Sequence, residues 1–136
     1  MIRELVAKKI CHLLKQRATN SFRILSIGCG NGLADWSMLQ IVTERFPGIG
    51  INYIGVDIDE KCCEQAREKL SSLRNVKADT SVLNFEQTDY SKADIPPCDL
   101  VLAEHIFYYM RDVNKAISNA HKLMKPNGMT YQVIYC

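Results

Sequence analysis

The chain has 136 residues, of which 47% are hydrophobic and 24% are charged, and its formal net charge is +2. This length suits one domain with a single core, because two cores would need a longer chain. The basic residues are scattered along the sequence, so charge gives no indication of binding to nucleic acid or to an acidic membrane. No apolar stretch approaches the roughly 20 residues that span a bilayer. The amino terminus also lacks the pattern of a signal peptide.

Helix-periodic and strand-like stretches alternate along the sequence. The first half is predicted to contain a helix over 2–16, a polar link over 17–23, a strand over 24–27, a helix over 33–46, a strand over 51–56 and a helix over 59–73. The second half is predicted to contain a strand over 99–103, a helix over 112–124 and a strand over 129–135. The third strand has two candidate positions: Val82–Phe85 alternates suitably, whereas Asn75–Ala78 would begin it earlier.

Regular alternation of strands and helices predicts right-handed βαβ units and a parallel sheet. We therefore expect an α/β fold with a Rossmann-like, doubly wound sheet of about five parallel strands, in the order 3-2-1-4-5, and with helices on both faces. The expected organisation is a single domain over 1–136, with an amino-terminal helix over 1–17 and the α/β core over 22–136. The six cysteines show no C-x-x-C spacing, so we expect reduced thiols rather than a zinc site.

Three alternating glycines follow the first predicted strand, in the segment Gly28–Gly32. A strand, a glycine turn and a helix place backbone N–H groups at the carboxyl edge of a sheet, where open α/β sheets bind nucleotides. The dinucleotide fingerprint G-x-G-x-x-G needs a third glycine at the position of Leu33. The pattern G-x-G-x-G therefore favours a site for S-adenosylmethionine (SAM) over a site for NAD. A plain strand-to-helix turn is the alternative.

Asp57 is expected at the carboxyl end of the second strand, where that strand faces the glycine turn. A carboxylate in this position accepts hydrogen bonds from both hydroxyls of a ribose, the diol that adenosine cofactors share. The alternative is a turn aspartate or a helix cap, and Asp59 competes for the capping role. We predict ribose binding by Asp57. The predicted cofactor contacts of this region are Gly28, Cys29, Gly30, Gly32, Asp57 and Ile58.

A second group of candidate residues follows the fourth predicted strand. Glu104 and His105 end that strand, and Tyr108 and Tyr109 come next. In the doubly wound order the fourth strand lies beside the first, so this loop borders the crevice at the switch point. We predict that His105, Tyr108 and Tyr109 contact the substrate, with packing against the next helix as the alternative. Thr88 is a weaker candidate for a contact with the adenine ring.

These residues give the chain a resemblance to the class I SAM-dependent methyltransferases, carried by Ile24–Gly32, Asp57 and Asp99–His105. Within that superfamily the chain is similar to the group around histamine N-methyltransferase. The runs that carry this finer similarity are Ile24–Gly28, Gly32 with Asp35, Phe46–Asn52, and Tyr108-Tyr109 with Asp112. The resemblance covers roughly Phe22 to Tyr135, and it implies a sheet that lacks the last two strands of the family.

Carried over by position, the resemblance implies further site residues. The implied cofactor contacts are Gly28, Asp57, Thr88 and the main chain of Glu104. The chain departs from the family at two positions. His105 stands where members have a substrate-facing glutamine, and Cys62 stands where they have a glutamine early in the third helix.

We therefore expect a SAM-dependent methyltransferase that acts on a small molecule such as an amine. The alternatives are a shortened SAM-binding domain that serves as a non-catalytic interaction module, and a NAD-linked oxidoreductase. No G-x-S-x-G, H-E-x-x-H or P-loop motif supports hydrolysis or phosphoryl transfer. The expected partner is a small methyl acceptor, without nucleic acid or membrane, in the cytoplasm. An uncovered fifth strand also predicts self-association through its open edge.

Overall fold

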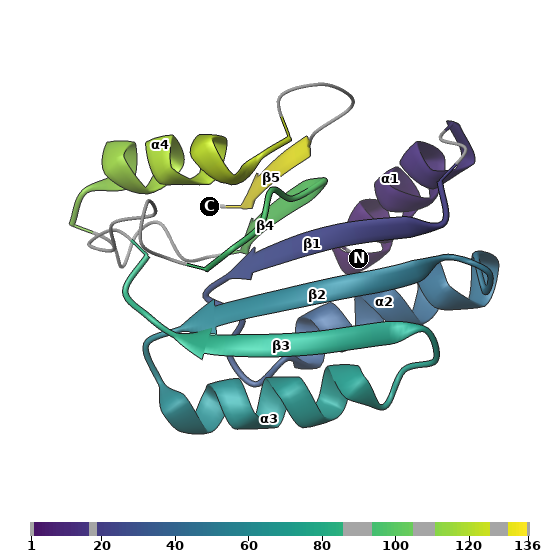
Figure 1. Cartoon of the computed structure of the whole chain (residues 1–136), viewed down its shortest axis with the longest axis horizontal. Helices are drawn as coiled ribbons and strands as arrows, with labels where there is room; N and C mark the ends of the chain where they lie inside the picture. The colour runs from purple at the N-terminus through teal and green to yellow at the C-terminus, as the bar shows by residue number, and fades with distance from the viewer. Residues whose placement is uncertain (1, 17–18, 86–93, 105–110, 126–130, 136) are drawn as a thin grey trace.

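The computed structural model describes residues 2–16, 19–85, 94–104, 111–125 and 131–135. The strands form one five-stranded sheet in the order β3-β2-β1-β4-β5, with β1 at its centre (Figure 1). Their bounds are β1 (Ser21–Ile27), β2 (Gly50–Asp57), β3 (Val76–Val82), β4 (Leu100–Glu104) and β5 (Tyr131–Tyr135). Each neighbouring pair is parallel. The predicted strand order and the parallel arrangement are therefore confirmed.

The helices occupy the predicted stretches of sequence. Their bounds are α1 (Ile2–Gln16), α2 (Leu33–Arg45), α3 (Glu60–Ser71) and α4 (Val113–Leu123). Asp59 caps α3, because its Oδ1 accepts hydrogen bonds from the N–H groups of Lys61 and Cys62 at 2.9 and 3.2 Å. A side-chain oxygen in this position satisfies donors that the first helical turn leaves open. The predicted cap at Asp59 is confirmed.

Two apolar clusters bury the two faces of the sheet, since successive side chains of a strand point to opposite faces. On one face, α1 and α2 pack against residues such as Phe22 and Ile24 of β1. On the other face, α4 packs against Leu25 and Ile27 of the same strand. Burial on both sides explains why the sequence from Ile24 to Ile27 is almost continuously apolar. Helices thus cover both faces, as predicted.

The first strand begins earlier than the sequence predicts. β1 starts at Ser21 rather than at Ile24, so part of the predicted polar link over 17–23 is strand. Its pairing with β2 begins at Gly50, opposite Ser21. Phe22 is fully buried within this added length. The segment 21–23 forms a strand despite its polar composition, because pairing with β2 gives its backbone N–H and C=O groups hydrogen-bond partners.

The third strand uses the earlier of its two predicted positions. The start at Asn75–Ala78 is correct, and the strand at Val82–Phe85 is wrong. The N–H of Leu83 donates to the carbonyl oxygen of Asp57 at 3.0 Å. Beyond this bond the chain leaves the sheet, and Phe85 is buried in the cluster beneath α4. Phe85 therefore contributes to the core from a connecting segment and not from a strand.

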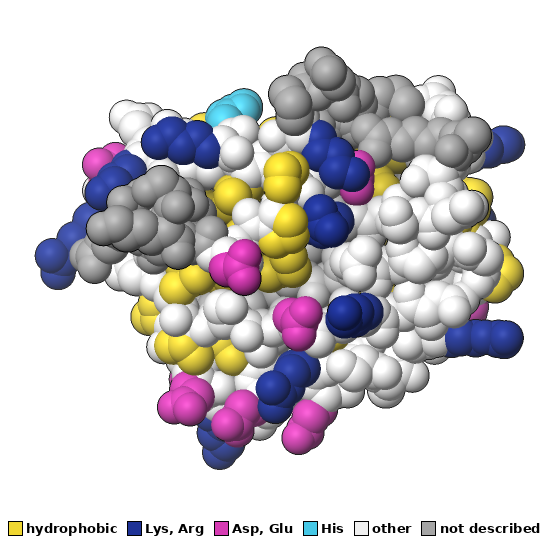
Figure 2. Space-filling model, in the orientation of Figure 1, with side chains coloured by type: hydrophobic (Ala, Val, Ile, Leu, Met, Phe, Trp, Pro, Cys, Tyr) yellow, Lys and Arg dark blue, Asp and Glu magenta, His cyan; other side chains and the backbone are white. Residues whose placement is uncertain are grey.

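The face of the molecule seen in Figure 2 mixes Lys and Arg with Asp and Glu, in line with the scattered charges of the sequence. In the part of the chain that the structure describes, we find no helix with the length and apolar character of a membrane span. The same residues contain no group of three or more His, Cys, Asp or Glu side chains arranged to hold a metal ion.

Candidate functional site

The glycine turn leaves β1 at its carboxyl end and enters α2. Gly28, Gly30 and Gly32 all have positive φ angles, of 68°, 56° and 82°, a region that L side chains avoid. The N–H groups of Gly28 and Cys29 both donate to the carbonyl oxygen of Val56, at 2.8 and 3.1 Å. The turn is thereby fastened to the end of β2, on the side where Asp57 follows.

Two of these glycines meet different surroundings. A Cβ at Gly30 would have no heavy atom within 4 Å, so this part of the turn faces open space. A Cβ at Gly32 would lie 2.8 Å from Ala66 Cα and 2.9 Å from Leu70 Cδ2, both on α3. Gly30 therefore leaves room for a ligand to approach the backbone, whereas Gly32 lets the start of α2 pack against α3. A cofactor contact at Gly32 stays a prediction.

Asp57 lies directly beside the glycine turn. Its Oδ2 accepts the Gly30 N–H at 2.9 Å, and its Oδ1 accepts the Asp59 N–H at 3.0 Å. The side chain is half-buried. Each carboxylate oxygen can accept a second hydrogen bond, so both remain able to bind a hydroxyl. Asp59 takes the capping role, and Asp57 joins the ends of β2 and the glycine turn. Its ribose contact stays a prediction.

Apolar side chains flank Asp57 at the same edge of the sheet. Ile58 is 73% exposed and Val82 is 53% exposed. Val82 is the register partner of Asp57 across β2 and β3. We call Ile58 and Val82 the apolar shelf.

A buried carboxylate lies beneath the glycine turn. Asp35, in the first turn of α2, is only 5% exposed. Its Oδ2 accepts the hydroxyl of Ser26 at 2.6 Å and the phenol of Tyr53 at 2.5 Å. Burial, together with the negative charge of Asp35, raises the pKa of Tyr53 well above its ordinary value. The phenol therefore stays protonated and donates a hydrogen bond to the carboxylate.

Sequence reasoning placed Asp35 in the family resemblance but gave it no role. A signal was nevertheless present, because Asp35 stands four and seven residues before Leu39 and Val42, on the inward stripe of α2. An acidic residue on the apolar stripe of a helix needs buried donors. Those donors come from β1 and β2, and no spacing rule in the sequence identifies them.

The cysteines near the site are protonated. Cys29 packs over Gly55, where an added Cβ would lie 2.9 Å from the Cys29 sulfur. Burial raises the pKa of Cys29 far above its ordinary value, and the neighbouring Cys63 adds to the shift. The pKa of Cys63 is also raised, first by burial and then by Asp57. Since the thiolate is the reactive form, neither sulfur is a nucleophile near neutral pH.

The remaining predicted site residues lie mostly outside the described part of the chain. Thr88, His105, Tyr108 and Tyr109 are outside the described residues. Glu104 is the last residue of β4, and its main chain reaches the same sheet edge as the glycine turn. The contacts predicted for these residues stay predictions.

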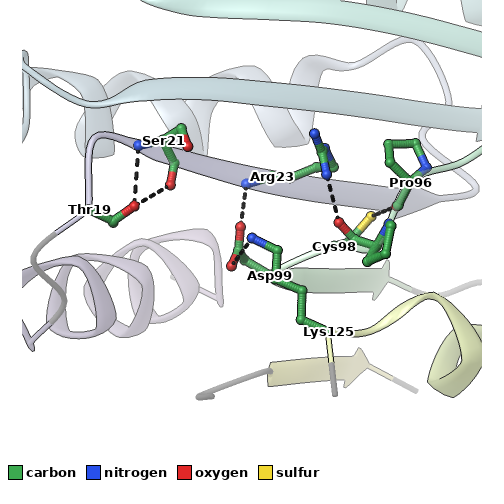
Figure 3. A network of polar contacts seen from close by, with 8 residues as sticks. Thr19, Ser21, Arg23, Pro96, Cys98, Asp99 and Lys125 are labelled. Carbon is green, nitrogen blue, oxygen red and sulfur yellow. Dashed lines mark hydrogen bonds and ion pairs between the residues drawn. The ribbon is translucent and has the colours of Figure 1, made fainter. Parts of the chain in front are cut away.

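A second polar network lies at the amino edge of the sheet (Figure 3). The buried Asp99 accepts the Arg23 N–H at 2.8 Å and pairs with the Lys125 ammonium at 2.9 Å. The Arg23 guanidinium donates to the Pro97 carbonyl oxygen at 2.9 Å. This network links β1 to the start of β4 and to Lys125, two residues beyond the end of α4. It stands at the opposite end of β1 from the glycine turn.

These features define the class of protein: a Rossmann-like α/β domain with a glycine turn and a carboxylate at one sheet edge. The family follows from comparison with known proteins. Residues 25–130 match a family model described as "Methyltransferase domain". The chain therefore belongs to the methyltransferase domain family, and its fold is that of the class I SAM-dependent methyltransferases.

Individual relatives are much longer than this chain. A non-reducing polyketide synthase of Metarhizium robertsii is 31% identical over 117 residues, which cover 80% of this chain and 5% of that protein. The citrinin polyketide synthase CMeT domain superposes with a TM-score of 0.77 at 21% identity, covering 97% of this chain and 34% of the other. A methyltransferase of Geobacter sulfurreducens, solved with S-adenosyl-L-homocysteine (SAH), gives a TM-score of 0.60 at 15% identity over 90% of this chain and 44% of the other. These similarities lend no support to the predicted histamine N-methyltransferase grouping.

Proposed function

We propose that this chain is a SAM-dependent methyltransferase domain that binds its cofactor at the carboxyl edge of the sheet. The observation that carries the proposal is the 2.9 Å hydrogen bond from the Gly30 N–H to Asp57, beside backbone that is open to a ligand. Family membership and the SAH-bound relative of the same fold support the choice of cofactor.

The described residues fit the chemistry of this cofactor. The open space at Gly30 would admit a ligand against the main chain. The free acceptor positions of Asp57 would bind the two ribose hydroxyls. The apolar shelf of Ile58 and Val82 would contact the adenine ring, with Thr88 and the main chain of Glu104 as further predicted contacts. Bound in this way, SAM supplies an electrophilic methyl group on a sulfonium.

We infer further that the methyl acceptor is a carbon of a polyketide-type thioester. The supporting observations are the relatives, which include a polyketide synthase at 31% identity and a CMeT domain with a TM-score of 0.77. A carbon nucleophile forms only when a base removes its proton. The sequence predicts His105, Tyr108 and Tyr109 as substrate contacts, and we propose that His105 or one of the tyrosines assists this step while the others position the acceptor. The earlier expectation of an amine acceptor has no support in the comparisons.

Calorimetric titration of the chain with SAH, SAM and NADH tests the cofactor. We expect saturable binding of SAH and SAM and none of NADH. Preferential binding of NADH would overturn the methyltransferase proposal in favour of an oxidoreductase.

Incubation with isotopically labelled SAM then tests the acceptor. The two acceptor classes are a β-ketoacyl thioester and a panel of small amines. Label on the carbon between the two carbonyl groups is the expected result, and label on nitrogen would overturn the carbon acceptor. Binding without transfer to either class would favour the non-catalytic module.

A further inference from the structure

We propose that Asp35 is a positioning residue, whose buried carboxylate holds the glycine turn of the cofactor site in its binding shape through Ser26 and Tyr53. The inference deepens the proposed function and rests on it. The hydrogen bonds from Ser26 and Tyr53 to Asp35 lie in the interior, so its effect would pass through the backbone that it anchors.

The placement of the three partners carries the inference. Ser26 lies on β1 two residues before the turn, and Asp35 lies on α2 three residues after it. Tyr53 lies on β2, the strand whose end carries Asp57. One oxygen atom, Asp35 Oδ2, accepts from both hydroxyls at 2.6 and 2.5 Å. Side chains from β1, α2 and β2 therefore meet at a single acceptor.

The charge of Asp35 suits this role. The cap residue of α2 is Gly32, which has no side chain to accept a hydrogen bond from the first helical turn. A carboxylate in the first turn is favoured by the partial positive charge of the helix amino terminus. A carboxylate that is 95% buried also requires strong donors to replace water, and two hydroxyl groups provide them. The network thus fixes the start of α2 relative to β1 and β2.

The position of α2 matters because α2 begins directly after Gly32, so it fixes the end of the turn that lies farthest from β1. The Trp36 N–H donates to the Gly32 carbonyl oxygen at 2.8 Å, so the first helical turn and the last glycine move together. At the end of the turn next to β1, the carbonyl oxygen of Val56 accepts the N–H groups of Gly28 and Cys29. With both ends held, the Gly30 N–H is kept within 2.9 Å of Asp57. Loss of the Asp35 anchor would free one end of this arrangement.

The ordinary alternative is that Asp35 only stabilises the core. Asp99 provides a matched control, because it is a carboxylate of similar burial (3% against 5% exposed) at the opposite edge of the sheet. We would compare Asp35→Asn with Asp99→Asn, measuring SAH affinity by calorimetry well below the unfolding temperature of each variant. We expect Asp35→Asn to weaken SAH binding about tenfold or more, since it removes the negative charge that the two hydroxyls bind and replaces one acceptor oxygen with an amide donor. Asp99→Asn should lose stability and keep an affinity near that of the parent chain.

Amide hydrogen exchange at Gly28, Gly30 and Gly32 gives a second readout that needs no ligand. These amides should exchange faster in Asp35→Asn than in Asp99→Asn at matched stability. Should Asp35→Asn fail to fold, Tyr53→Phe removes a single hydroxyl and should change affinity and exchange in the same direction. Ser26→Thr, which keeps the hydroxyl, should retain the affinity that Ser26→Ala loses.

Equal effects of the Asp35 and Asp99 variants on affinity, or unchanged exchange at the turn, would overturn the positioning role. If the parent chain does not bind SAH, the proposed function fails, and the exchange comparison still decides whether Asp35 holds the turn.

Discussion

Gly30 and Gly32 belong to one turn but are glycine for different reasons. Both have positive φ angles, of 56° and 82°. At Gly30 the space beyond the backbone is open, whereas at Gly32 it is filled by Ala66 and Leu70 of α3. A methyl group added at the two positions should therefore affect different properties of the chain, namely ligand binding at the first and packing at the second.

We expect Gly30→Ala to lower the free energy of unfolding by about 1 kcal/mol through backbone strain and to abolish most SAH binding. Gly32→Ala should cost about 1–3 kcal/mol more, because the new methyl overlaps the Ala66 main chain. Urea denaturation and calorimetry on both variants measure the two properties. If Gly30→Ala bound SAH as the parent does, the open face of the turn would not be the cofactor site.

Asp57 and Asp59 offer a second matched pair. Asp57→Ala should weaken SAM binding by about 1–3 kcal/mol, because it leaves ribose hydroxyls and the Gly30 N–H without an acceptor. Asp59→Ala removes the cap of α3 and should lower stability by about 1 kcal/mol with little change in affinity. Titration of each variant with SAM separates the two roles. An unchanged affinity in Asp57→Ala would remove this residue from the site.

Among the elements, β1 connects two polar networks of different kinds. Its carboxyl end enters the glycine turn, above the buried carboxylate of Asp35. Its amino end is held to β4 by Arg23 and Asp99. Next to Asp99, burial raises the pKa of the Cys98 thiol to about 11, against the opposing charge of Arg23. The interior around the sheet therefore holds several groups that keep their protons to a higher pH in the folded chain than in the unfolded chain.

This pattern predicts a loss of stability at alkaline pH. Cys98 has a folded pKa of about 11 against an ordinary value of 9.0, and the pKa values of Cys29 and Tyr53 are raised as well. Above the ordinary pKa the unfolded chain releases protons that the folded chain retains. The contribution of Cys98 is therefore complete below about pH 9 and disappears as the pH rises through about 11.

Urea denaturation under reducing conditions at pH 7.5, 9 and 10.5 would measure this loss, and the free energy of unfolding should fall across the series. Cys98→Ala should reduce the slope between pH 9 and 11. A free energy of unfolding that stays constant from pH 7.5 to 10.5 would contradict the raised pKa values.

For the molecule as a whole, the sheet order places β5 at one edge. Within the described residues β5 pairs with β4 alone. An edge strand presents unpaired backbone groups that can bind a second strand. We propose that the 136-residue chain self-associates through this edge, and sedimentation velocity over a range of concentrations measures it. A constant monomeric sedimentation coefficient at all concentrations would contradict the proposal.

Local patterns in the sequence were sufficient for the layout of the fold. The alternation of apolar runs and helical stripes predicted the helices, most of the strands and the cap at Asp59, because each depends on neighbours in the chain. The parallel sheet and its strand order followed from the general topology of alternating strands and helices. The start of β1 and the position of β3 were predicted less well. Both are decided by pairing with β2, which is formed by residues far away in sequence.

The sequence by itself determined that a glycine turn and an acidic residue end two adjacent strands, since strand ends and turn glycines follow from local composition. Only the tertiary structure decided that Asp57 accepts the Gly30 N–H, that Gly32 serves helix packing, and that Asp35 is buried beneath the turn. The physical reason is that each of these contacts joins separate elements. Their partners are chosen by the packing of helices on the sheet and not by spacing along the chain.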